Sequence, residues 1–331
     1  MFPSLTTFKQ MSNTPGNILK KIEKAQEEQA TELYLYWHPE LTEFPEEVFA
    51  LEQLEVLRVG GSFEENCTIE VIPDEIKALK NLKELHFGFA QVTTLPDALL
   101  ELKNLKVLSL PRNLFTEVPE QVMKMTQLET LSVAGNLLES FPEDMSAFKD
   151  LTVLDISGND LDSIPASVFQ LEKLERLYSN FNLLTEVPGD IRQLKGLKEL
   201  QLMYNDISTV PDELMALPKI DQINLLCNPI NMLPESMSTS NLKSMALNIE
   251  DEEAKVMMND MTVGRALIYG MREPSKASEK YFRQIRYPKI SNVPKEIVRQ
   301  GTQAVKEFLL NLDLDDPSLD IDIDIDEEMN L

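Results

Sequence analysis

The stretch LKVLSLPRNLFTEVP at residues 105–119 decides the fold. It returns as LETLSVAGNLLESFP at residues 128–142 and as LTVLDISGNDLDSIP at residues 151–165. A proline recurs at every 23rd position from Pro73 to Pro234, so these copies belong to a longer series. A fixed period of this length indicates one supersecondary unit copied many times, which is the signature of a solenoid.

Each copy follows the pattern LxxLxLxxNxL, which is that of a leucine-rich repeat. Two apolar residues spaced two apart, such as Leu108 and Leu110, have the period of a β-strand and point into a shared core. The Asn of the pattern, here Asn113, turns the chain out of the strand, and its amide can bond backbone groups in the bend. The segment after the proline has apolar residues at helical spacing, which predicts a short helix or 3₁₀ turn on the convex side.

The expected fold is therefore an α/β leucine-rich repeat solenoid (horseshoe) with about ten parallel strands on its concave side and a helical cap at each end. Three irregular features stand out. An insertion near residues 60–66 predicts a loop, Cys67 and Ala90 take the Asn position of their units, and Ser179 replaces a core residue. The expected strands are centred near Tyr34, Arg58, His86, Ser109, Ser132, Asp155, Tyr178, Gln201, Asn224 and Ala246.

The two ends differ from the repeats. Apolar residues Ile18, Ile22 and Ala25 fall on one side of a helical pattern, which predicts a helix that covers the first strand. Near the other end, residues 297–310 repeat this kind of spacing. The expected organisation is a disordered start (1–16), an N-terminal capping helix (17–30), the repeats (31–250), a helical C-terminal cap with an insertion (251–311) and an acidic disordered tail (312–331).

The repeat and its Leu-Pro punctuation resemble intracellular leucine-rich repeat proteins of the Ras-group and Roco types. Residues 22–35 are similar to their N-terminal cap, and residues 293–305 are similar to their closing helix. The resemblance covers roughly residues 17–310 and implies a scaffold that recognises other proteins. Roco proteins also carry a Roc GTPase domain, but no G-x-x-x-x-G-K-[ST] sequence occurs in this chain, so we expect no P-loop.

Composition favours a cytoplasmic protein. The chain has 2 cysteines, Cys67 and Cys227, and both fall inside repeats, which is typical of a reducing compartment. The first residues lack an apolar signal-peptide core, and no apolar run approaches ~18 residues. We therefore expect neither secretion nor a membrane span.

The net charge of −25 is spread unevenly along the chain. Residues 1–250 carry −19, residues 251–306 carry +4, and residues 307–331 carry −10. Such a balance disfavours nucleic acids and anionic membranes as partners, because their phosphates would be repelled. It also keeps a long protein with much surface soluble.

Residues next to the core strand positions are expected on the concave face, where aromatic, Arg and Met side chains are typical of binding hot spots. Two aromatic groups flank a stretch of small residues, and Tyr178, Phe181, Met203 and Tyr204 are the expected main anchor. Six strand steps separate Trp37 from Phe181, a span of ~29 Å, which favours a protein over a small molecule as the ligand. The alternative is that neighbouring aromatic residues only stack along the sheet, or that Trp37 belongs to the cap. The candidate partner-binding residues are Tyr34, Tyr36, Trp37, Arg58, His86, Phe89, Arg112, Arg176, Tyr178, Phe181, Met203 and Tyr204.

Nothing in the pattern indicates catalysis, a cofactor or a metal. The 2 histidines, His38 and His86, lie in different repeats, and no zinc spacing or Ser/His/Asp set occurs. The expected function is a non-enzymatic adaptor in intracellular signalling or regulation that binds a protein partner. The alternatives are an autoinhibited regulatory subunit or sensor, gated by an acidic tail that folds back on basic residues 276–289, and an enzyme with its site in residues 251–311.

Overall fold

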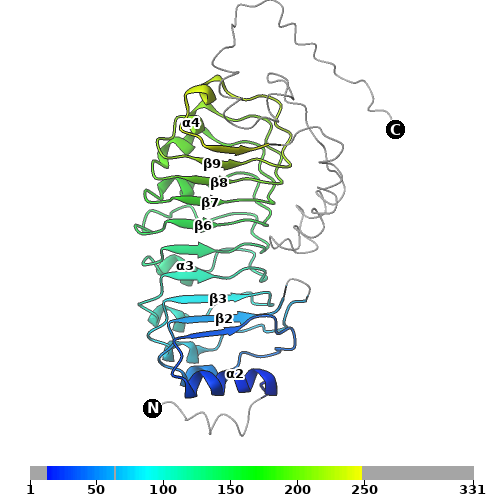
Figure 1. The fold of residues 1–331 in the computed structure, drawn as a ribbon, viewed down its shortest axis with the longest axis vertical. Helices are drawn as coiled ribbons and strands as arrows, with labels where there is room; N and C mark the ends of the chain where they lie inside the picture. The colour runs from blue at the N-terminus through cyan, green and yellow to red at the C-terminus, as the bar shows by residue number, and fades with distance from the viewer. Residues whose placement is uncertain (1–12, 63–64, 248–331) are drawn as a thin grey trace, which may run out of the picture.

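The computed structural model describes residues 13–62 and 65–247. Ten strands form one parallel sheet in which each strand pairs with the next along the chain (Figure 1), which confirms the solenoid that the repeat predicts. The strands are β1 Glu32–Leu35, β2 Val56–Gly60, β3 Glu84–Gly88, β4 Val107–Ser109, β5 Thr130–Ser132, β6 Val153–Asp155, β7 Arg176–Tyr178, β8 Glu199–Gln201, β9 Gln222–Asn224 and β10 Ser244–Ala246.

The sheet has the register that the repeat predicts. Tyr34 pairs with Arg58 and Arg58 with His86, and the same position then continues across the sheet to Ala246. In β1–β9 the residue at this position faces outward, while its apolar neighbours, such as Leu108 and Leu110, are buried. Stacking the repeats thus forms one continuous core that no single repeat could form alone.

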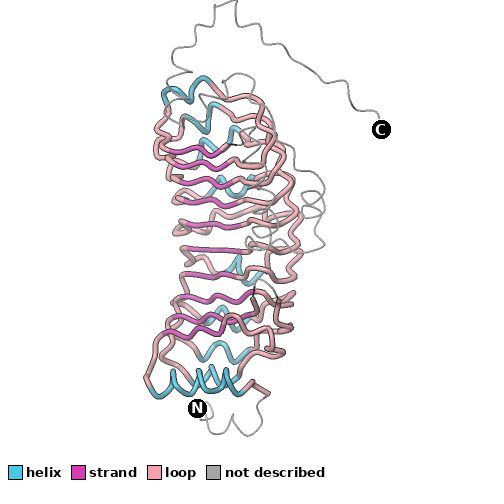
Figure 2. The backbone as a smooth tube through the Cα atoms, turned by 45° about the vertical axis from the view of Figure 1, so that its right-hand side comes forward, coloured by secondary structure: helices cyan, strands magenta, loops and turns pink. Residues whose placement is uncertain are grey.

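Short helical segments lie behind the strands and face away from them (Figure 2). Each begins directly after a proline of the repeat, whose ring fixes φ near the value that a helix start needs. A convex layer of this kind was predicted from the helical spacing. The segments are η1 Glu46–Ala50, η2 Asp74–Ala78, η3 Asp97–Glu101, α3 Glu120–Lys124, η4 Ala166–Gln170, η5 Gly189–Gln193, α4 Asp212–Met215 and η6 Glu235–Thr239.

Helix α2, Gly16–Glu27, covers the first repeat at the N-terminal end of the stack (Figure 1). Its apolar side buries Ile18 and Ile22 completely and leaves Ala25 only 6% exposed. This is the helix expected near residues 17–30. Residues 1–12 of the expected disordered start (1–16), the expected C-terminal cap at 251–311 and the expected acidic tail at 312–331 lie outside the described residues, while Gly16 already belongs to α2. Among the residues described, no helix combines the length and hydropathy that a membrane span requires.

The Asn side chains of successive repeats form a hydrogen-bonded ladder inside the bends. Asn136 donates from Nδ2 to the carbonyl oxygens of Leu110 (3.1 Å) and Val133 (2.9 Å) and accepts the N–H of Phe115 on Oδ1 (3.2 Å). These bonds satisfy buried backbone groups that the turn leaves without partners. The same three-way arrangement occurs at Asn113, Asn159, Asn205 and Asn228. At Asn182 the Ser179 hydroxyl takes the place of one of the two carbonyl oxygens.

Polar side chains at two irregular positions of the repeat find hydrogen-bond partners of their own. Ser179 is fully buried where other repeats have an apolar residue, and its Oγ lies 3.3 Å from Nδ2 of Asn182, so the ladder satisfies the hydroxyl. His38 takes the Asn position of the first repeat, which the sequence analysis missed. Its Nε2 lies 2.9 Å from Nζ of Lys21 in α2, and its Nδ1 lies 3.0 Å from Oε1 of Glu40. The first repeat therefore replaces the ladder with a contact to the capping helix.

Candidate protein-binding surface

The outward-facing side chains of β1–β10 form a surface that we call the strand face, and they lie in two rows. It is the surface that the sequence analysis expected on the concave side. The first row is Glu32, Val56, Glu84, Val107, Thr130, Val153, Arg176, Glu199, Gln222 and Ser244. The second row is Tyr34, Arg58, His86, Ser109, Ser132, Asp155, Tyr178, Gln201 and Asn224.

Five side chains on β1–β3 touch one another and form what we call the N-terminal cluster: Glu32, Tyr34, Arg58, Glu84 and His86. The Tyr34 hydroxyl donates to Oε2 of Glu32, and the Arg58 guanidinium lies over the Tyr34 ring, 5.4 Å from its centroid. Oε2 of Glu84 lies 3.8 Å from Arg58 and 3.4 Å from Nε2 of His86. The cluster thus joins two carboxylates, one guanidinium and one imidazole across three strands.

The electrostatics of this cluster follow from its contacts. The hydrogen bond to Glu32 raises the pKa of Tyr34. Burial, together with the charge on Arg58, lowers the pKa of His86, against the opposite effect of Glu84. His86 is therefore neutral at pH 7, so Glu32, Glu84 and Arg58 together carry a charge of about −1.

Two large aromatic side chains at this end are exposed. Tyr34 is 49% exposed, and Trp37, which directly follows the strand region, is 62% exposed. Both were predicted from the sequence as contact residues, and the structure leaves their surfaces accessible. Tyr36, which was also predicted, is half-buried as a whole residue. Burial of its hydroxyl group raises the pKa of Tyr36.

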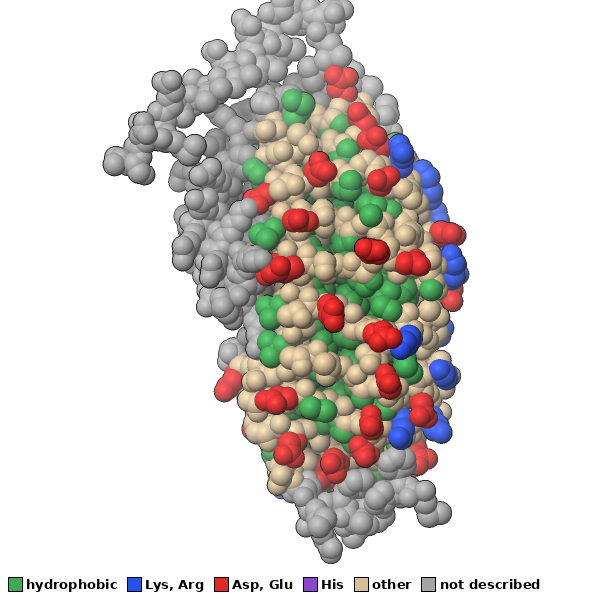
Figure 3. All heavy atoms as spheres, turned by 180° about the vertical axis from the view of Figure 1, so that it is seen from behind, with side chains coloured by type: hydrophobic (Ala, Val, Ile, Leu, Met, Phe, Trp, Pro, Cys, Tyr) green, Lys and Arg blue, Asp and Glu red, His purple; other side chains and the backbone are tan. Residues whose placement is uncertain are grey.

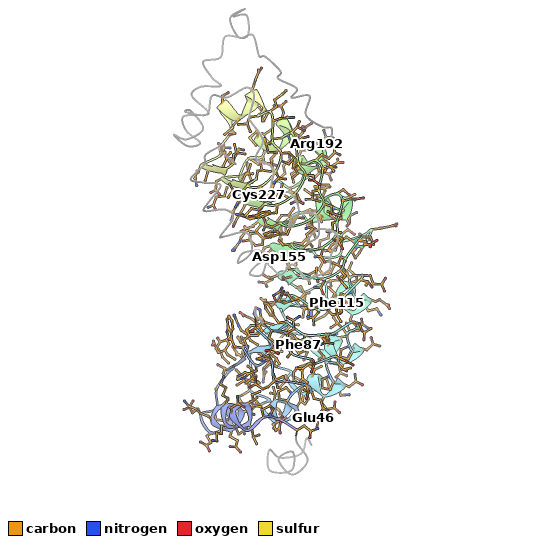
Figure 4. The ribbon with its side chains drawn as sticks, turned by 90° about the vertical axis from the view of Figure 1, so that its right-hand side faces the viewer. Glu46, Phe87, Phe115, Asp155, Arg192 and Cys227 are labelled. Carbon is orange, nitrogen blue, oxygen red and sulfur yellow. The ribbon has the colours of Figure 1, made fainter. Side chains whose placement is uncertain are left out.

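Small side chains cover the middle of the strand face. Ser109, Ser132 and Asp155 follow one another in the second row, and Figure 4 places Asp155 between Phe115 and Cys227 along the stack. The Asp155 carboxylate accepts the N–H of Ser157 (3.0 Å) and the Ser132 hydroxyl (3.3 Å). Although its residue surface is partly exposed, desolvation of the carboxyl raises the pKa of Asp155. The predicted stretch of small residues is therefore present.

A second polar cluster follows on β7 and β8. The Tyr178 hydroxyl donates to Oε2 of Glu199 at 3.2 Å, and Nε2 of Gln201 donates to Oε1 of the same carboxylate at 3.0 Å. Burial and the charge of Glu199 raise the pKa of Tyr178. Arg176 is exposed beside them. Of the residues expected to be the main anchor, only Tyr178 lies in this cluster.

The other expected anchor residues do not lie exposed on the strand face. Phe181 is 1% exposed, while Met203 and Tyr204 are each 4% exposed. The Phe181 and Tyr204 rings stack at 4.4 Å in a small apolar cluster of their own. Phe89 and Arg112 are similarly buried, with the guanidinium 5.4 Å from the ring centroid. The expectation that these five side chains are exposed on the strand face is therefore wrong. Their role in binding stays a prediction.

For Phe181 and Tyr204 this burial goes with the backbone at the residue before the Asn position. Phe181 and Tyr204 both have φ of +53° there, a left-handed conformation that directs the chain into the bend. Two repeats have Gly135 and Gly158 at this position, which is the signal in the sequence that could have revealed it. Phe89, Arg112 and Cys227 share this conformation at the same position. Trp37 shares it too but remains exposed in the first repeat.

Acidic and basic side chains lie on different parts of the solenoid surface (Figure 3). The nine segments from the Asn position to the second residue after the proline contain acidic residues but no Lys or Arg. Figure 3 shows Asp and Glu spread over the face seen from behind and Lys and Arg gathered along one edge. Ion pairs between neighbouring repeats also form, such as Lys83 with Glu55 (2.7 Å) and Lys198 with Glu175 (2.8 Å).

Within residues 13–62 and 65–247, no group of three or more His, Cys, Asp or Glu side chains is placed to hold a metal ion.

Glu32, Glu84 and Glu199 were missed by the sequence analysis as members of the surface. Each lies two residues before a second-row position, so the strand period alone would have identified them.

Comparisons with known proteins agree with this architecture. The "Leucine rich repeat" family profile matches residues 103–161 and 149–207. Among solved structures, a leucine-rich repeat protein of Leptospira interrogans is 29% identical with a TM-score of 0.55, and the alignment covers 70% of this chain and 57% of that one. Comparison with curated proteins gave no match.

Two further solved structures share the fold. The plant peptide hormone receptor RGFR1, solved in complex with RGF2, is 24% identical with a TM-score of 0.52, covering 66% of this chain and 36% of the receptor. The PEPR1–AtPEP1 structure is 26% identical with a TM-score of 0.51, covering 65% and 30%. This chain therefore spans between about a third and somewhat over half of these proteins. The sheet and these matches give this chain a leucine-rich repeat fold.

Proposed function

We propose that this protein is a non-enzymatic adaptor that binds a protein partner on its strand face, in cytoplasmic signalling or regulation. The observation that supports this proposal most is the N-terminal cluster, which presents an exposed aromatic ring, a guanidinium and two carboxylates across three strands. Tyr, Trp and Arg are the side chains that most often dominate protein interfaces. Leucine-rich repeat proteins commonly bind proteins, and one of the similar structures is titled as a plant peptide hormone receptor, RGFR1, in complex with RGF2.

Affinity capture of partners with the full chain, followed by mass spectrometry, tests this proposal. The matched variant is Tyr34→Ala with Trp37→Gly, because glycine tolerates the left-handed φ of +70° at that position. We expect at least one partner that wild type captures and that the variant loses. The control variant is Val71→Ala with Met232→Ala, which removes two exposed apolar side chains outside the strands. Each of these residues lies two positions before a repeat proline. Equal capture by wild type, variant and control would contradict the proposal.

A further inference from the structure

We infer that the N-terminal cluster recognises a Lys or Arg side chain of the partner, held between Glu32 and Glu84 above Val56. This inference rests on the proposed function and adds the chemistry of the partner. Glu32, Val56 and Glu84 are consecutive in the first row, because each is paired with the next in the sheet. Two strand steps separate the carboxylate-bearing residues by ~10 Å at their Cα atoms, so their flexible side chains can both reach one cation.

Each carboxylate has an oxygen with which to accept further hydrogen bonds. The contacts of Glu32 and of Glu84 within the cluster use Oε2 in both cases, to Tyr34, Arg58 and His86. Among the described residues, Oε1 of Glu32 and Oε1 of Glu84 make no hydrogen bond or ion pair. Val56 between them is apolar and only partly buried, which provides a surface for the methylene groups of a long cationic side chain.

The charge of the cluster matches a cation. Arg58 neutralises one of the two carboxylates, and His86 is neutral at pH 7, so one further positive charge balances the set. The stacking of Arg58 on Tyr34 shows that this part of the face already accommodates a guanidinium on an aromatic ring. An ammonium offers three donors and a guanidinium five, enough to serve both free oxygens.

The surroundings favour the approach of a basic segment. The described bend segments carry acidic residues without any Lys or Arg, and the whole chain has a net charge of −25. Such a field attracts cationic partners and repels anionic ones. The overall charge does not determine where on the strand face a cationic side chain binds. The two free carboxylate oxygens beside the exposed Tyr34 provide that position.

Selection of a random peptide library on the immobilised full chain tests this inference. We expect the enriched peptides to share Lys or Arg at one position. Glu32→Gln with Glu84→Gln keeps the size of both side chains and should weaken binding of an enriched peptide about tenfold. Glu117→Gln with Glu186→Gln, the same charge change at exposed bend positions, should leave binding within about twofold.

The outcomes separate the two proposals. If no peptide is enriched on wild type, this inference is contradicted, while the proposed function is decided by the affinity capture described above. Enriched peptides without a basic residue, or equal weakening by the two double variants, would contradict the inference alone. The chain's own basic residues 276–289 are the competing occupant. A carbodiimide cross-link within one chain from Glu32 or Glu84 to Lys276, Lys280 or Lys289 would identify them instead and overturn the inference.

Discussion

Nδ2 of Asn136 donates to the carbonyl oxygen of Leu110, 26 residues earlier in the chain, at 3.1 Å. The same side chain accepts the N–H of Phe115. One buried amide therefore joins two consecutive repeats and satisfies backbone groups in both bends. The solenoid depends on such contacts because each repeat contacts only its neighbours.

Asn136→Ala should destabilise the protein by about 2–3 kcal/mol, because it leaves buried backbone donors and acceptors without partners. The midpoint of urea unfolding, followed by circular dichroism, measures this change. The control is Asn104→Ala, which removes one exposed bond to the carbonyl of Lys80 and should cost less than about 0.5 kcal/mol. Equal losses for the two variants would show that the ladder does not stabilise the fold.

Gly60→Ala should be strongly destabilising. A Cβ at Gly60 would lie 1.9 Å from the carbonyl oxygen of Gly88 in the next repeat, and neither backbone can move without breaking the β2–β3 pairing. We expect a loss of about 3 kcal/mol or more in urea unfolding. At Gly16, in the first turn of α2, a Cβ would meet nothing within 4 Å. Gly16→Ala should therefore be neutral or slightly stabilising, and a comparable loss there would contradict this account of Gly60.

The contact between His38 and Lys21 should hold the capping helix on the first repeat. His38→Ala removes the group that accepts from Lys21 and contacts Glu40, so the amides of α2 should exchange hydrogen about tenfold faster. Lys24→Ala is the control, since Lys24 makes only an exposed ion pair with Glu28 at 3.7 Å. If exchange in α2 is unchanged in His38→Ala, helix docking depends on the apolar residues alone.

Stability should fall at mildly acidic pH through His86. Its folded pKa lies below the ordinary value of 6.5, since burial and then Arg58 disfavour the charged form. Below pH 6.5 the unfolded chain binds more protons at this site, so this contribution is full above that pH and is lost as pH falls through the folded pKa. His86→Gln should flatten the stability profile between pH 7.5 and 5. A profile with the same slope as wild type would exclude His86 as the cause.

The repeat period predicted most of the fold because each proline and Asn occupies a fixed place in the unit. The register Ser109–Ser132–Asp155 follows from this alone. The sequence analysis did not predict the burial of Phe181 and Tyr204, since alternation along a strand stops where the backbone becomes left-handed. Nor could spacing predict the Glu84 contacts, because the geometry of long side chains depends on their neighbours in other repeats.

The central claim is that the strand face binds a protein partner through the N-terminal cluster. The affinity of a captured partner for Tyr34→Ala with Arg58→Ala, compared with wild type by calorimetry, measures this most directly. Lys77→Ala with Lys103→Ala, two exposed changes away from the strands, is the control. Loss of about 2 kcal/mol or more, roughly thirtyfold in Kd, in the cluster variant alone is the predicted result. Unchanged affinity in a folded cluster variant would contradict the claim.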